Sequence, residues 1–289
     1  MKRTAPTEVK ESRTGRTKVQ AVRTRPGNAM GQKAFTLIEL LVVVAVITVL
    51  LAVLLPSLSR CRALAARLKC ASNLRQLWIA WDSYTAAHNG DFYQRVNANV
   101  SYGGWRGIKN WWREEDGRPW NRYAGFSDPN YVTEQSAEVF CCPADRGGIP
   151  GSLLREKAYR VHGTSYQTNL FLVGPDGCRA FSDHTAELDA MISARLPGLN
   201  LTHVANPSRV LLIGDYGWVN QWKPKPHPKP EWKELAEWHR RADHHNVAFL
   251  DGHVEFLEIR KGYYVTTEYC VLPFEDLFGL AREVQGPVE

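Results

Sequence analysis

The first strong pattern in this chain is an uninterrupted apolar run from Phe35 to Leu55, in which only Thr36, Glu39 and Thr48 are polar. At 1.5 Å per residue, a helix of this length spans about 30 Å, the thickness of the hydrocarbon core of a bilayer. A core helix of a soluble protein would carry a polar stripe, and a secretory signal peptide would have a shorter apolar region. The run therefore predicts a transmembrane helix.

After Pro56 the apolar positions recur every three or four residues, as on one face of a helix. Asn89-Gly90 is a typical helix stop. We therefore expect one helix of about 50 residues, whose second half packs against a soluble domain. Two rows make up this face: Cys61, Leu64, Leu68, Ala71, Leu74 and Trp78, then Leu74, Leu77, Trp81 and Tyr84.

Two later segments have the pattern of β-strands. Residues 209–213 predict a buried strand, and residues 246–257 predict a β-hairpin with Asp251-Gly252 in a type I′ turn, where both residues need positive φ. The expected fold class is α+β, with the long N-terminal helix packed on a small antiparallel sheet. The expected division is a basic leader at 1–34, a transmembrane helix at 35–56, the distal half of the helix at 57–90 and a head domain at 91–289.

Positive charge is concentrated in the leader. Residues 1–34 hold nine Lys and Arg against two Glu, a net +7, whereas the whole chain carries +6, so the rest sums to −1. Nucleic-acid binding by the head is therefore not expected. A basic leader predicts a cytoplasmic N-terminus, with residues after about 58 on the outer side of the membrane. Either Met1 or Met30 could begin the translated chain.

The residues Lys33 to Glu39, K-A-F-T-L-I-E, closely resemble the processing motif of type IV prepilins and type II secretion pseudopilins. The resemblance implies that a prepilin peptidase cleaves between Ala34 and Phe35 and methylates the new amine of Phe35. It also implies that Glu39 pairs with the N-terminus of a neighbouring subunit during assembly. The family usually has Gly before the cleaved bond, whereas this chain has Ala34.

Three further segments, 70–77, 140–145 and 246–255, resemble a pseudopilin-like subfamily whose C-terminal part is described as His, nine residues, Asp-Gly. Here Asp251-Gly252 is present, but Arg241 stands at the expected histidine position and His239 lies two residues earlier. The resemblance implies a pilin-like structural subunit of the inner membrane, not an enzyme, with its head in the periplasm. Its partners would be other pseudopilin subunits and an inner-membrane secretion or pilus assembly platform.

All six cysteines follow the apolar run, so the expected topology places them in an oxidising compartment. We expect Cys70 on the helix to form a disulfide with Cys141 or Cys142, although six cysteines allow 15 full pairings. No cofactor is expected, and calcium or zinc is the alternative. The candidate metal ligands are His239, Asp243, His244, His245, Asp251 and His253.

The spacing of these histidines and aspartates is not standard for a metal site, and a polar loop with a hairpin rim explains it equally. The alternative function is a membrane-tethered periplasmic binding module or metal-dependent enzyme that uses residues 239–253. Trp105, Trp111, Trp112 and Trp120 either form a sugar-binding surface or anchor an irregular region onto a core.

Overall fold

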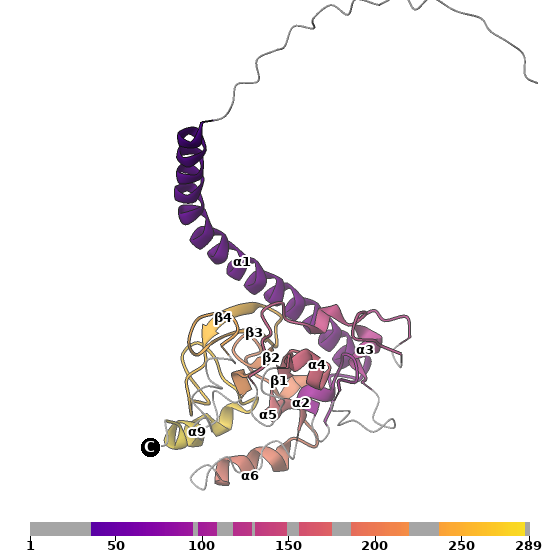
Figure 1. Cartoon of the computed structure of the whole chain (residues 1–289). Coiled ribbons are helices and arrows are strands. Elements are labelled where there is room, and N and C mark those ends of the chain that lie inside the picture. The colour runs from indigo at the N-terminus through magenta and orange to yellow at the C-terminus, as the bar shows by residue number, and fades with distance from the viewer. Residues whose placement is uncertain are drawn as a thin grey trace, which may run out of the picture. The chain divides into compact units, whose positions relative to one another are not determined.

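The computed structural model describes residues 36–94, 98–108, 118–128, 131–148, 156–174, 186–219 and 237–286 (Figure 1). The expected cleavage site at Ala34 and Phe35 lies outside these residues, as do Trp111, Trp112 and Cys178. The chain divides between Val53 and Leu54 into two compact units.

Helix α1 (Leu37–Ala87) has 51 residues and continues through Pro56, which confirms the prediction of one helix of about 50 residues. It ends where the sequence predicts, because Asn89 and Gly90 have positive φ values of 54° and 88°. The Gly90 N–H then reaches back to the Thr85 carbonyl at 2.7 Å, which satisfies one of the last carbonyls of the helix.

The other helices of the described residues are short, and the head is otherwise built from loops between them. The α-helices are α2 (Ala98–Ser101), α3 (Trp120–Tyr123), α4 (Ala158–His162), α5 (Leu170–Val173), α6 (Ala186–Arg195) and α9 (Phe278–Val284). Three single turns of 3₁₀-helix lie at Glu138–Phe140, Leu201–His203 and Glu275–Leu277.

The head contains a four-stranded antiparallel sheet in the order β1-β2-β3-β4. Its strands are β1 (Tyr166–Thr168), β2 (Leu211–Asp215), β3 (His244–Phe249) and β4 (Val254–Glu258). Strand β2 and the β3–β4 hairpin follow the sequence prediction, and the α+β fold class is confirmed. The three-residue strand β1 was not predicted.

The hairpin turn differs from the predicted type I′ turn. Among the two turn residues only Gly252 has positive φ, at 91°, because the connection holds three residues between the Phe249–His253 pair rather than two. The Gly252 N–H donates to the Phe249 carbonyl at 3.0 Å. This is the arrangement in which a glycine follows a tight turn as a bulge, and it places the positive φ on one residue alone.

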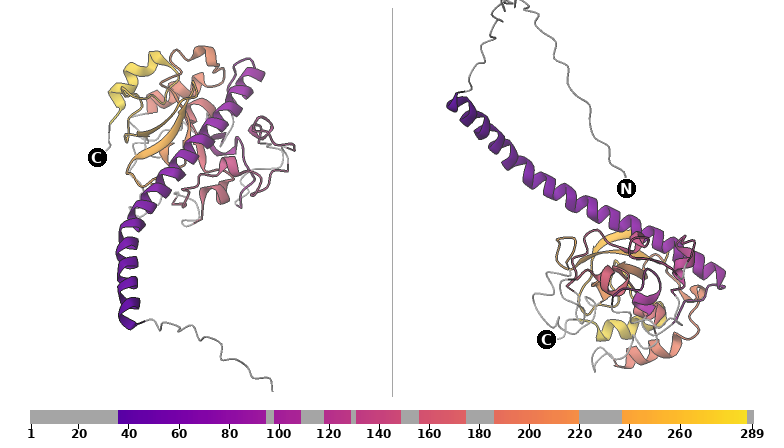
Figure 2. Two further views of the ribbon diagram at one scale, coloured as in Figure 1. Left: turned by 90° about the horizontal axis from the view of Figure 1, so that it is seen from above. Right: turned by 45° about the vertical axis from the view of Figure 1, so that its right-hand side comes forward.

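The distal part of α1 forms one wall of the head, and both views in Figure 2 show it lying along that domain. One face of this part of the helix is buried, with an exposed fraction of at most 1% for Cys70, Leu74, Leu77 and Trp81. The predicted row was too long, since Leu64 and Leu68 remain exposed. Apolar periodicity identifies the helix face that can be buried, but it does not show at which residue the head begins to bury it.

Aromatic side chains fill the core beneath the end of α1. The Trp120 ring is fully buried and lies 4.1 Å from Trp81 and 4.5 Å from Tyr84, measured between ring centroids. Trp105 is half-buried and donates its indole N–H to the Tyr159 carbonyl at 2.9 Å. Trp105 and Trp120 therefore support the interpretation that tryptophans anchor an irregular region onto the core, rather than form a sugar-binding surface.

Candidate functional site

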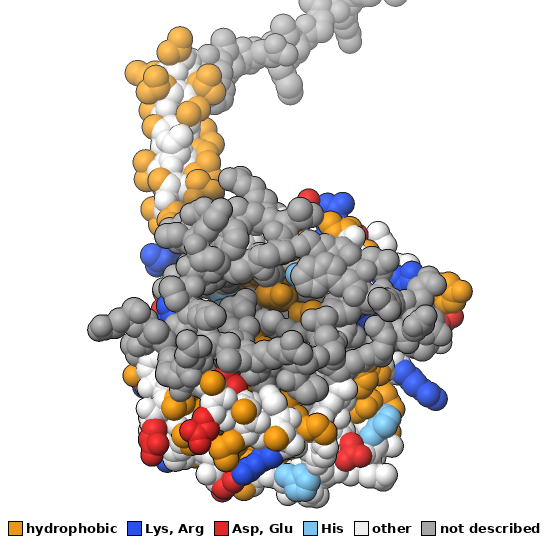
Figure 3. Space-filling view, turned by 90° about the horizontal axis from the view of Figure 1, so that it is seen from below, with side chains coloured by type: hydrophobic (Ala, Val, Ile, Leu, Met, Phe, Trp, Pro, Cys, Tyr) orange, Lys and Arg blue, Asp and Glu red, His pale blue; other side chains and the backbone are white. Residues whose placement is uncertain are grey.

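The described part of the first unit is the beginning of α1, whose surface there is almost wholly hydrocarbon. The most apolar stretch of 18 residues in α1 has a mean hydropathy of 3.1, and none of its residues is buried. In the space-filling view hydrophobic side chains cover this segment (Figure 3). One long apolar helix near the N-terminus fits a single-pass membrane anchor.

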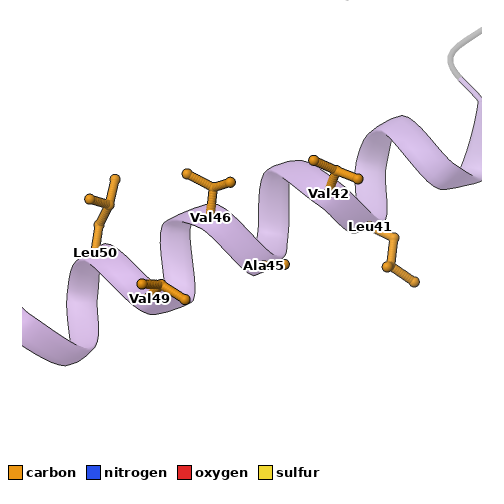
Figure 4. A pocket seen from close by; sticks show the side chains of 6 residues that line it. All are labelled: Leu41, Val42, Ala45, Val46, Val49 and Leu50. Carbon is orange, nitrogen blue, oxygen red and sulfur yellow. The ribbon is translucent and has the colours of Figure 1, made fainter.

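A shallow groove runs along this helix between side chains spaced three and four residues apart. Val42, Val46 and Leu50 project from the same side of the helix (Figure 4). The remaining lining residues are Leu41, Ala45 and Val49, so the groove is apolar throughout. Such a surface suits lipid chains or the ridge of another apolar helix.

Glu39 completes a reciprocal cap at the start of α1. Its Oε2 accepts hydrogen bonds from the backbone N–H and the hydroxyl of Thr36, each at 2.9 Å. The Glu39 N–H in turn donates to the Thr36 hydroxyl at 3.3 Å. This is a capping box, T-x-x-E, and it ties the proposed assembly carboxylate to the backbone next to the expected cleavage point.

In the head, the candidate metal ligands of residues 239–253 separate into two groups. His239 and His245 lie in the core before and at the start of β3, and both contact Asp215 at the end of β2. Asp251 and His253 lie beyond the other end of β3, where the Asp251 carboxylate and the His253 ring are 2.6 Å apart. The sequence cluster is therefore not one site.

The remaining two candidates lie outside both groups. His244 is half-buried, and its Nδ1 is 2.6 Å from the Ala242 carbonyl. Asp243 adopts positive φ, at 58°, as does Arg240 at 60°. These two left-handed residues let the chain turn sharply between the buried His239 and strand β3.

Asp215 is the centre of the buried polar group. Its Oδ1 lies 2.7 Å from His245 Nδ1, its Oδ2 lies 3.0 Å from His239 Nε2, and Oδ2 also accepts the Asn246 N–H at 3.0 Å. Burial opposes its charge, but the neighbouring His245 and His239 outweigh burial and lower the pKa of Asp215 to about 2. Burial lowers the pKa of His239, but hydrogen bonds to Asp215 and Cys142 outweigh it and raise that pKa to about 10.

Two cysteines complete this part of the core. The Sγ atoms of Cys70 and Cys142 and one ring nitrogen of His239 all lie within 4.8 Å of one another. Cys142 Sγ is 3.6 Å from His239 Nε2. The structure therefore brings Cys70 next to Cys142, while the neighbouring Cys141 directs its thiol to the Cys142 carbonyl. Cys70, Cys141 and Cys142 are all free thiols, so the expected disulfide between Cys70 and Cys141 or Cys142 stays a prediction.

The Asp-Gly turn has a role that its sequence alone did not indicate, because it docks on α1. Trp78 donates its indole N–H to the Leu250 carbonyl at 2.9 Å, and Arg75 donates to the Gly252 carbonyl. A Cβ added to Gly252 would lie 2.5 Å from the Trp78 ring. Glycine is needed there both for its backbone conformation and for this close approach.

The sequence interpretation missed the buried carboxylates of Asp215 and Asp145. Asp215 is the last residue of the buried strand β2, two residues beyond the predicted strand 209–213. Asp145 is also buried, and it accepts hydrogen bonds from three backbone N–H groups and from the Ser165 hydroxyl. An aspartate at the end of a buried strand is a usable signal for the first, but nothing local marks the second.

Residues 29–55 match the family model described as the prokaryotic N-terminal methylation motif. Comparison with curated proteins and with solved structures found no match to the chain. The matched segment contains Glu39 and most of the apolar part of α1. It indicates a type IV pilin-like protein that is anchored in a membrane, processed by a prepilin peptidase and assembled with other pilin-type subunits.

Proposed function

We propose that this chain is a pseudopilin-like structural subunit of a type II secretion or type IV pilus-like assembly in the cell envelope. The observation that carries the proposal is the methylation motif placed directly on a continuous apolar helix with one carboxylate at its start. In this proposal the peptidase cleaves between Ala34 and Phe35 and methylates Phe35. The apolar half of α1 then packs with other subunits above an inner-membrane assembly platform.

The proposed orientation has the N-terminus in the cytoplasm and the head in the periplasm. The net charge of +7 on residues 1–34 supports it, because basic segments are retained on the cytoplasmic side. The subunit would perform no catalysis. A membrane-tethered enzyme built on residues 239–253 has less support, because its candidate ligands lie at two ends of β3 rather than around one centre.

The capping box gives the proposal a sharp test, because it separates two roles of Glu39. Glu39→Gln keeps a side-chain acceptor for the Thr36 N–H but removes the charge, whereas Thr36→Ala keeps the charge and removes the hydroxyl of the cap. Thr48→Val is the matched control, since the Thr48 hydroxyl bonds only the Ala45 carbonyl of its own helix turn. If assembly needs the charge, Glu39→Gln fails and the other two variants assemble.

The measurements are the mass of the N-terminal peptide from cells and the yield of cross-linked multimers in membranes. We expect a methylated Phe35 in the wild type and in all three variants, with multimers lost in Glu39→Gln alone. An intact leader in the wild-type protein would contradict the proposed processing. Undiminished multimers in Glu39→Gln would contradict the proposed role of the carboxylate.

A further inference from the structure

Three ligand-type side chains converge in the head from segments that are far apart in sequence. Cys70 comes from α1, Cys142 from the loop after the 3₁₀ turn Glu138–Phe140, and His239 from the segment before β3. Cys70 and Cys142 have no exposed surface, and the side chain of His239 is 2% exposed. None of the three belongs to the apolar membrane segment, so the proposed assembly role does not use them.

We propose that Cys70, Cys142 and His239 form a structural Zn²⁺ site that fastens α1 to the head. Thiolate sulfur and imidazole nitrogen are the ligands of closed structural zinc sites. With Zn–S bonds of about 2.3 Å and a Zn–N bond of about 2.0–2.1 Å, a tetrahedral site holds its sulfur and nitrogen about 3.6 Å apart. Cys142 Sγ and His239 Nε2 are separated by 3.6 Å.

The second sulfur fits the same site. Two sulfurs on one tetrahedral zinc lie about 3.8 Å apart, which is inside the 4.8 Å that encloses all three ligand atoms. A disulfide would instead bring the two sulfurs to about 2.05 Å and would leave the imidazole without a part in the link. The histidine contact is therefore what distinguishes a metal site from a simple cysteine pair.

Asp215 contacts the same imidazole nitrogen as Cys142. Its Oδ2 is 3.0 Å from His239 Nε2, so a carboxylate oxygen is within reach of the fourth position around the metal. The same carboxylate holds His245 and the Asn246 N–H, which fixes it in place. On binding, Zn²⁺ replaces the two thiol protons and the proton on the imidazole nitrogen, and these are released to solvent.

The site would add a metal link between three parts of the head that packing and hydrogen bonds, such as that from the Asn73 side chain to the Cys141 carbonyl, already join. Cys70 lies on the first fully buried turn of α1, at the position where the helix meets the domain. A metal at this position would add a link between the membrane-proximal end of the buried helix face and the sheet. Removing it should lower the thermal stability of the head without affecting the N-terminal segment.

The test uses the full chain purified in detergent under reducing conditions, incubated with Zn²⁺ and dialysed. We expect about one Zn²⁺ per chain by elemental mass spectrometry, and a Co²⁺-substituted sample should show thiolate-to-metal charge-transfer absorption. Cys70→Ser, Cys142→Ser and His239→Gln should each lose most of the bound metal. The matched controls Cys141→Ser and His253→Gln should retain it, since neither residue belongs to the site.

A second measurement remains decisive if the ligand variants fail to fold. In the wild-type chain, bound Zn²⁺ should protect Cys70 and Cys142 from alkylation, and a chelator should restore their reactivity and lower Tm. A dialysed wild-type chain without metal would overturn the proposal. So would a Cys70–Cys142 disulfide in protein isolated from cells under non-reducing conditions.

Discussion

The contact between the hairpin tip and α1 allows a quantitative prediction for Gly252→Ala. A Cβ at Gly252 would lie 2.5–2.7 Å from three carbons of the Trp78 indole, which is closer than real Cβ contacts come. The residue also has φ +91°, a conformation that side-chain-bearing residues rarely adopt. The substitution therefore carries a steric and a conformational penalty at once.

The two penalties can be estimated separately. The left-handed conformation costs about 1–2 kcal/mol for alanine, and forcing extra volume into a packed contact costs about 1–3 kcal/mol. Their sum predicts a loss of about 2–5 kcal/mol in the free energy of unfolding of the head. For a domain of this size, each kcal/mol lowers Tm by about 2–4 °C, so the fall in Tm should be about 4–20 °C.

Gly125→Ala is the matched control. Gly125 has a similar φ of +85°, but a Cβ there would meet nothing within 4 Å. This variant should lose only the conformational part, about 1–2 kcal/mol. The difference between the two variants isolates the contact with Trp78.

The assay is thermal unfolding of the full chain in detergent, followed by near-UV circular dichroism. In a Trp78→Ala background the steric part of the Gly252→Ala penalty should disappear, which a double-mutant cycle measures. Equal losses for Gly252→Ala and Gly125→Ala would refute the docking of the hairpin tip on α1. A Gly252→Ala penalty that stays larger than the Gly125→Ala penalty without the Trp78 indole would refute it as well.

Further predictions concern the rest of the head. Asp145→Asn removes an oxygen that accepts two of the four hydrogen bonds of Asp145, and it should lower the free energy of unfolding by about 3–6 kcal/mol. Ser165→Ala removes one of these bonds and should lower it by about 1.5–3 kcal/mol. Urea unfolding of the two variants measures both losses. Burial raises the pKa of Cys270 from 9.0 to about 12. The contribution of Cys270 to stability should therefore be constant below pH 9 and fall above it, as the unfolded chain releases a proton that the folded chain holds. Accordingly, maleimide labelling at neutral pH should be fast at the exposed Cys61 and slow at the buried Cys270, as peptide mapping would show. Gly279→Ala, in α9 with open space around the new Cβ, should raise stability by about 0.4–1 kcal/mol, and an unchanged or lower Tm would contradict it.

The sequence predicted the elements whose patterns are local. Helix α1 follows from a long apolar run and a three-to-four spacing, and the β3–β4 hairpin follows from alternation on either side of Asp251-Gly252. Strand β1 has three residues and is buried throughout, so it offers no alternation to detect. The predicted type of the hairpin turn was wrong. The number of residues in the turn depends on the register of the two strands, which tertiary contacts set.

The buried polar centre could not be predicted in the same way. Cys70, Cys142 and His239 are separated by about 70 to 100 residues, and no spacing rule connects them. The sequence instead grouped histidines and aspartates that are neighbours along the chain, and β3 then carried them to opposite ends of a strand. Proximity in sequence is a weak guide to a site wherever an extended strand separates the candidates, because each residue of a strand adds about 3.3 Å.

The apolar half of α1 also explains how a polar residue is tolerated inside it. Hydrocarbon requires polar groups to be satisfied internally, and here Thr48 and Ser57 bond the Ala45 and Leu54 carbonyls of their own helix. Glu39 is satisfied by Thr36 as far as hydrogen bonds go, yet its charge has no cationic partner among residues 36–59, which contain no Lys or Arg. A cap alone needs only an acceptor, and glutamine would provide it at lower cost in lipid. A positive group supplied from outside the described segment would explain glutamate at this position, and the proposed pairing with a subunit N-terminus would supply it.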